Sequence, residues 1–173
     1  MKKAVALIIM VISLLITGCQ WNSGLSEPES NLEFWIGENV DEVDFSQYQE
    51  KYGLMGGREY YGTGYVPTLD EEGQQLDPEY YVVYTITSYP DYASKTKHIT
   101  GITITDPSIK IYGLSINSSK EDIKLIMGTN EGFEIEEVGE DTLIARKGDY
   151  TFCFSSKAIT IRVEVTNKMG IVF

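Results

Sequence analysis

The chain has 173 residues and a formal net charge of −12, with 14 lysines and arginines against 26 aspartates and glutamates. This length suits one substantial domain or two small lobes with a real core. A surface this acidic repels nucleic acid phosphates and anionic lipid head groups, which argues against nucleic acid as a partner. The charge suits a soluble domain, or one that meets a basic partner or cations.

The beginning of the chain has the organisation of an export signal. Two lysines precede an apolar run, Ala4–Ile12, which is shorter than the roughly 20 residues of a transmembrane helix. Thr17 and Gly18 follow, directly before Cys19. These residues resemble the lipobox of bacterial lipoproteins. The resemblance implies cleavage before Cys19 and acylation of its sulfur, so that lipid holds the protein on the extracytoplasmic face of the cell membrane.

Two other interpretations of this segment are an uncleaved membrane anchor and an ordinary signal peptide in which Cys19 has no special role. Removal of residues 1–18 leaves 155 residues and a net charge of −14, because two lysines and no acids are lost. With Cys19 acylated, Cys153 has no partner for an intrachain disulfide. Its position between Phe152 and Phe154 in an alternating segment favours a shielded structural thiol.

The elements expected after the signal begin with a polar tether, residues 19–31, which starts at the acylated cysteine. Beyond the tether, capping residues and terminal glycines predict two short helices, Ser46–Gly53 and Ser118–Gly128. Alternation of apolar and polar residues predicts strands near residues 58–65, 80–88, 99–105, 133–137, 143–147, 150–154 and 159–166.

Two parts of the chain are similar to each other. The segment Ile99–Asp106 is echoed by Ala158–Asn167, and a predicted helix precedes each group of strands. The sequence therefore predicts an α+β fold with two similar lobes, residues 32–106 and 107–173, each a short helix packed on an antiparallel β-meander. The uncovered sheet faces would carry Tyr81, Thr85 and Thr87 in the first lobe and Thr160, Arg162, Glu164 and Thr166 in the second.

A glycine precedes each predicted helix, in the pairs Ile36-Gly37 and Tyr112-Gly113. This order of helix and meander, repeated at a spacing of roughly seventy residues in an exported chain, is similar to the β-lactamase-inhibitor-protein fold and to the related small lipoprotein of the outer-membrane assembly machinery. The resemblance covers most of residues 32–166. It implies a non-enzymatic protein-binding function and transfers no site residues. No inhibitory loop matches, so β-lactamase is not implied as a target.

Tyrosines are concentrated in the first predicted lobe, where ten of the twelve lie between Tyr48 and Tyr92. Tyrosine combines a large apolar ring with a hydroxyl that tolerates water, which suits a recognition surface. The alternative is that these rings line half-buried strands and bridge the two lobes. The residues that we expect to bind a protein partner, together with the open sheet face, are Tyr60, Tyr61, Tyr65, Tyr89 and Tyr92.

No catalytic or metal-binding pattern is present in the sequence. His98 is the only histidine, and no nucleophile elbow accompanies it. One histidine and one free thiol cannot form a standard zinc site, and the acidic loop within residues 67–78 lacks the ligand spacing of an EF-hand. We expect no cofactor and no enzymatic activity. Two alternatives stay open: a small-ligand or sugar-binding lipoprotein, and a hydrolase of envelope polymers that uses two carboxylates.

Overall fold

The structure, a computed structural model, describes most of the chain after residue 27. The signal peptide, Cys19, Tyr65, Tyr92, most of the tether and most of the acidic loop lie outside the described residues. For residues 68–69 and 75–76 only the backbone is described. The described residues are 28–52, 57–62, 68–69, 75–76, 80–89, 91 and 93–165.

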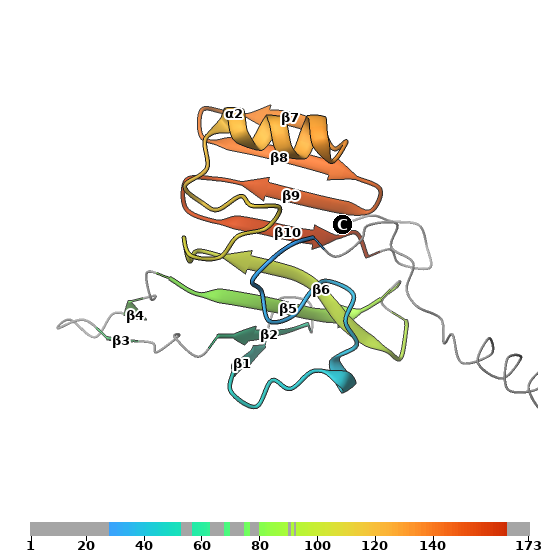
Figure 1. Ribbon diagram of the computed structural model, residues 1–173. Helices are drawn as coiled ribbons and strands as arrows, with labels where there is room; N and C mark the ends of the chain where they lie inside the picture. The colour runs from blue at the N-terminus through green and yellow to red at the C-terminus, as the bar shows by residue number, and fades with distance from the viewer. Residues whose placement is uncertain are drawn as a thin grey trace, which may run out of the picture.

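One continuous antiparallel sheet of eight strands dominates the structure (Figure 1). The strand order across it is β1-β2-β5-β6-β10-β9-β8-β7. A separate two-stranded pair consists of β3 (Thr68–Leu69) and β4 (Gln75–Leu76). The strands of the large sheet are β1 (Gln49–Tyr52), β2 (Arg58–Tyr61), β5 (Val82–Ser88), β6 (Lys97–Ile104), β7 (Glu134–Val138), β8 (Thr142–Lys147), β9 (Tyr150–Phe154) and β10 (Ile159–Val163).

The predicted α+β fold with two helix-plus-sheet lobes is wrong, because β6 and β10 pair with each other and join both halves of the chain in one sheet. Ile104 lies opposite Ile159, and Ile102 lies opposite Ile161. Each half is a meander that runs from an outer edge of the sheet to its centre. Two separate lobes would each leave a long edge of unpaired backbone groups, and the central pairing removes both edges.

The first predicted helix, Ser46–Gly53, is also wrong, since Gln49–Tyr52 is strand β1 and pairs with β2. A single 3₁₀ turn, η1 (Val40–Glu42), precedes it. The N–H of Ser46 donates to the carboxylate of Asp44, an interaction that forms a turn and not a helix cap. A helix of under two turns has little stability of its own, so pairing with the exposed edge of β2 prevails.

The second predicted helix is confirmed, with its cap one residue later than expected. Ser119 caps α2 (Lys120–Ile123), which continues as the π-helix η3 (Lys124–Asn130). Ile123 and Met127 are buried toward the sheet. A Cβ atom at position 128 would lie 3.1 Å from Cγ1 of Ile135, so Gly128 allows the close approach of this helix to β7.

The hydrophobic core lies on one face of the sheet, beneath two different covers. The helix α2–η3 covers the second half, and the irregular segment Phe34–Val43 crosses the first half (Figure 1). Backbone hydrogen bonds between this segment and Ile99, at 2.9 and 3.0 Å, hold it on β6. The strand residues of the core that are almost fully buried include Ile86, Ile99, Ile102, Ile104, Leu143, Phe152, Ile159 and Ile161.

Alternation of buried and more exposed residues is confirmed in β9 and β10, whereas β6 has four consecutive buried residues, Ile99–Ile102. In β10, Ile159, Ile161 and Val163 are buried, whereas Arg162 is exposed and Thr160 is half-buried. In β9, Cys153 is a half-buried free thiol between the buried Phe152 and Phe154, as the pattern predicts. The face opposite the helix therefore carries mostly polar side chains in the described residues.

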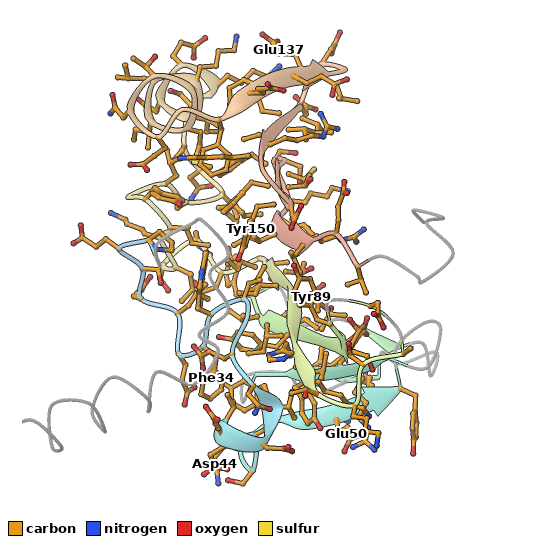
Figure 2. All side chains as sticks on the ribbon, turned by 90° about the vertical axis from the view of Figure 1, so that its right-hand side faces the viewer. Phe34, Asp44, Glu50, Tyr89, Glu137 and Tyr150 are labelled. Carbon is orange, nitrogen blue, oxygen red and sulfur yellow. The ribbon has the colours of Figure 1, made fainter. Side chains whose placement is uncertain are left out.

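The two outer strands carry ion pairs. Nη1 of Arg58 in β2 lies 3.0 Å from Oε1 of Glu50 in β1. The ammonium of Lys124 in η3 contacts the carboxylate of Glu137 in β7. Figure 2 shows Glu50 and Glu137 at opposite ends of the sheet. Charged side chains on an edge strand disfavour pairing with the edge of another sheet.

Replacement of Ile161 by alanine tests the central pairing. Ile161 is fully buried and lies opposite Ile102 and Phe152, so the variant should lose about 2–5 kcal/mol of unfolding free energy. The measurement is urea unfolding, followed by far-UV circular dichroism and by Trp35 fluorescence in a Trp21→Phe background. Both probes should give one coincident transition, because the halves share a sheet.

The matched control is Thr160→Ala on the open face, which should change the unfolding free energy by about 0.5 kcal/mol or less. Two separated transitions, or an Ile161→Ala variant as stable as this control, would contradict the shared core.

Candidate functional site

The structure separates the predicted tyrosines from one another. Tyr60 is 9% exposed and belongs to the core, with its ring centroid 4.1 Å from that of Phe45. Tyr61, the next residue in β2, points to the opposite face of the sheet. Tyr89 directly follows the last residue of β5, whereas Tyr61 lies beside the start of that strand. Tyr89 packs edge-on against His98, at a centroid distance of 6.4 Å. These three described tyrosines do not form one surface.

Tyr60 is part of an aromatic cluster that fills the core of the first half. The rings of the cluster pack at centroid distances from 4.1 to 6.0 Å. The cluster takes the place of a helix between the irregular N-terminal segment and the strands. Its members are Phe34, Phe45, Tyr48, Tyr60 and Tyr84.

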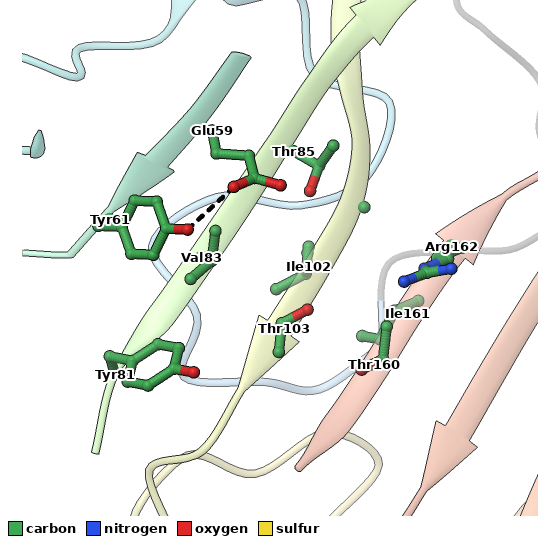
Figure 3. Close-up of a pocket in the computed structure, with 11 residues that line it drawn as sticks. Glu59, Tyr61, Tyr81, Val83, Thr85, Ile102, Thr103, Thr160, Ile161 and Arg162 are labelled. Carbon is green, nitrogen blue, oxygen red and sulfur yellow. Dashed lines mark hydrogen bonds between the residues drawn. The ribbon is translucent and has the colours of Figure 1, made fainter. Parts of the chain in front are cut away.

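The opposite, polar face contains a shallow groove over its central strands (Figure 3). We call it the open-face groove, and its volume is about 180 Å³. Gly101 of β6 lies at its centre, between Thr85 of β5 and Arg162 of β10. A Cβ atom at position 101 would lie 3.2 Å from Cβ of Thr85, so the missing side chain creates the depression. The side chains around it include Glu59, Tyr61, Tyr81, Thr85, Thr103, Thr160 and Arg162.

The two walls of the open-face groove differ in charge. On the β2 wall, the Tyr61 hydroxyl donates to Glu59 Oε2 at 2.9 Å, and Lys51 Nζ lies 4.5 Å from the centroid of the Tyr61 ring. On the β10 wall, Arg162 exposes its guanidinium beside Thr160 (Figure 3). A bound group would therefore meet a carboxylate and a phenol on one side and a guanidinium on the other.

Several residues of this groove were not among the tyrosines singled out as site residues, although the sequence contained signals for most of them. Gly101 interrupts the alternation of Ile99–Ile104, and glycine inside a strand often marks a close approach of another group. Tyr81, Thr85, Thr160 and Arg162 were expected on the open face, where they lie. Glu59 carried no such signal, because only the strand order shows that β2 lies near the glycine.

The single histidine is held in the fold. His98 Nδ1 lies 3.0 Å from the backbone oxygen of Gly37, and its ring is half-buried. This hydrogen bond attaches His98 to the segment that covers the core. Within the described residues, no group of three histidine, cysteine or acidic side chains could hold a metal ion.

The chain matches no protein-family model, and comparisons with characterised proteins and with solved structures give no significant match. Within the part of the chain that the structure describes, no helix is both long enough and apolar enough to cross a membrane. The functional argument therefore depends on the geometry of the sites themselves.

The aromatic cluster predicts a specific loss of stability at alkaline pH. Burial raises the pKa of Tyr84 to about 12. The pKa of Tyr48 is also raised, mainly by burial and to a smaller extent by the hydrogen bond to Glu33. An unfolded tyrosine has a pKa of about 10. Since the folded pKa values are higher, the stability that the neutral phenols provide is complete below about pH 10 and is lost as the pH rises through the folded values.

We expect the melting temperature, measured by differential scanning calorimetry, to fall steeply above about pH 10. The fall should be shallower in Tyr84→Phe, which has no phenol to ionise at that position. A Tyr84→Phe variant whose melting temperature falls as steeply as that of the parent protein would show that Tyr84 does not contribute.

Proposed function

We propose that this protein is a membrane-anchored extracytoplasmic lipoprotein whose folded domain binds a protein partner, without catalysis, through the open-face groove. The observation that supports the binding function is the notch at Gly101, bordered by tyrosine, threonine and arginine side chains on rigid central strands. Tyrosine and arginine are enriched in the centres of protein interfaces. Because the notch lies within a sheet, its lining is held in place before a partner arrives.

The size of the groove favours a protein partner over a free ligand. Pockets for small molecules usually have volumes of about 300–1,000 Å³. The open-face groove, at about 180 Å³, has room for one side chain of a partner whose other residues lie across the polar face. An acidic group of the partner would meet Arg162, and a hydrogen-bond donor would meet Glu59.

The same lining disfavours a glycosidase at this place. That chemistry needs two carboxylates on opposite sides of the scissile bond. Glu59 is the one carboxylate among the described residues that line the groove, and it accepts a hydrogen bond from Tyr61. The carboxylate and the guanidinium on opposite walls suit recognition better than acid–base catalysis.

Site-specific crosslinking tests this proposal. A photoreactive phenylalanine derivative at Thr85, inside the groove, should give one discrete adduct in cells, and the same derivative at Ser156, in the turn after β9, should not. Arg162→Ala should reduce the adduct at position 85 at least about tenfold, equivalent to about 1.4 kcal/mol of binding free energy. Lys157→Ala is the matched control, because it removes one positive charge outside the groove. An equal adduct yield from both alanine variants would contradict recognition through the groove.

Lipid attachment is tested independently by metabolic labelling with a clickable palmitate analogue. The parent protein should carry the label and sediment with membranes, whereas Cys19→Ala should lose the label because its thiol is the acylated atom. Cys153→Ala is the control and should keep it, since Cys153 lies within strand β9. Label that persists in Cys19→Ala and disappears in Cys153→Ala would contradict the proposed anchor.

A further inference from the structure

A second cavity lies where β5 begins, between that strand, the segment Asn31–Glu33 and the turn after β6. We call it the tyrosine pocket, and its volume is about 270 Å³. Four tyrosines and two carboxylates contribute to its lining. These residues are Tyr48, Tyr80, Tyr81, Tyr84, Glu33 and Asp106.

The aromatic part of the pocket is held by the core of the first half. Tyr84 is only 2% exposed and packs against Tyr48 at a centroid distance of 5.8 Å. The hydroxyl of Tyr48 donates to the carboxylate of Glu33, and the hydroxyl of Tyr84 accepts from the N–H of Phe34 at 3.4 Å. Tyr80, in contrast, is 49% exposed. The pocket therefore combines one buried ring, Tyr84, and one half-buried ring, Tyr48, with a ring that solvent reaches.

The described lining of the pocket carries negative charge and no positive charge to balance it. Glu33 is exposed, and Asp106 is half-buried with its Oδ1 accepting from the N–H of Ser108 at 2.8 Å. Among the described residues that line the pocket, none is lysine, arginine or histidine. Elsewhere the fold pairs carboxylates with bases, as in Glu50 with Arg58. No such ion pair reaches Glu33 or Asp106 within the described part of the chain.

We propose that the tyrosine pocket binds an alkylammonium group. Aromatic rings attract cations through their electron-rich faces, and sites that recognise quaternary ammonium groups are built from several such rings. Two carboxylates at the same site add long-range attraction, which the acidic surface of the whole chain reinforces. The volume of about 270 Å³ lies just below the usual range of ligand pockets and suits a group of about the size of choline.

This site differs from the open-face groove in position and in chemistry, although both include Tyr81 in their linings. The groove contains a guanidinium, which would repel a cation, and the pocket contains none in its described lining. Binding of an alkylammonium group does not depend on the protein partner proposed for the groove. An alkylammonium site would agree with the alternative in which the lipoprotein binds a small ligand, and that ligand would be a cation.

The test compares three probes on the full protein, purified in the uncharged detergent dodecyl maltoside. The probes are choline chloride, its neutral isostere 3,3-dimethylbutan-1-ol and N-acetyl-lysine methylamide, each at matched ionic strength. Binding is followed through the amide chemical shifts of Tyr80 and Asp106 in two-dimensional NMR spectra. Choline should give saturable shifts in the millimolar range, at least tenfold tighter than the neutral alcohol. If the lysine derivative binds more tightly than choline, the alkylammonium group that the pocket prefers is a primary ammonium and not a quaternary one.

Two variants connect binding to the pocket. Asp106→Asn removes a charge but keeps an oxygen that can accept from Ser108, and it should weaken choline binding at least fivefold. Asp141→Asn makes the same chemical change at an exposed position after β7, outside the pocket, and should leave the affinity unchanged. Tyr80→Leu keeps an apolar side chain without the aromatic ring, and it should weaken binding at least threefold.

Three results would overturn the proposal. They are equal affinity for choline and the neutral alcohol, equal effects of Asp106→Asn and Asp141→Asn, and no saturable shift up to about 100 mM of either cation. The far-UV circular dichroism spectrum of each variant shows whether a loss of binding reflects a loss of folding. Arg162→Ala, which tests the groove, should leave choline binding intact, so the two proposals can fail separately.

Discussion

The pairing of β6 with β10 determines the rest of this structure. Backbone hydrogen bonds join the two meanders, and Ile102, Ile104, Ile159 and Ile161 become almost fully buried on the covered face. The same register sets the opposite face, because Gly101 can form a notch only when β5 and β10 lie on either side of it. Core and groove are thus two consequences of one pairing.

The two halves of the sheet are covered differently, and this asymmetry explains where the tyrosine pocket lies. The second half is covered by the helix α2–η3, in which Gly128 permits contact with Ile135. The first half is covered by an irregular segment and the aromatic cluster. Rings joined by loops fill space less regularly than a helix, so a cavity with fixed walls remains at the start of β5.

Charged side chains are arranged differently at the edges of the sheet, in the open-face groove and in the tyrosine pocket. Ion pairs such as Arg146 with Glu136 lie on the outer strands, where each adds little stability but disfavours pairing with the edge of another sheet. The groove contains opposite charges on its two walls, and the tyrosine pocket contains only carboxylates in its described lining. Within the described residues, acidic side chains are thus paired with bases at the edges of the sheet, lie opposite a guanidinium in the groove, and have no base beside them in the lining of the tyrosine pocket.

The sequence by itself determined the local elements. Alternation located the strands from β5 to β10 and their buried faces, and the caps located the helix near Ser118, because these signals lie within single segments. Tertiary structure alone decided that Gln49–Tyr52 pairs as a strand and that the halves form one sheet. It also decided that Tyr60 joins the core while Tyr61 borders the groove, since strand order and edge pairing depend on contacts between distant residues. Acylation at Cys19 remains a prediction from the sequence, because the lipobox is a linear signal read before folding.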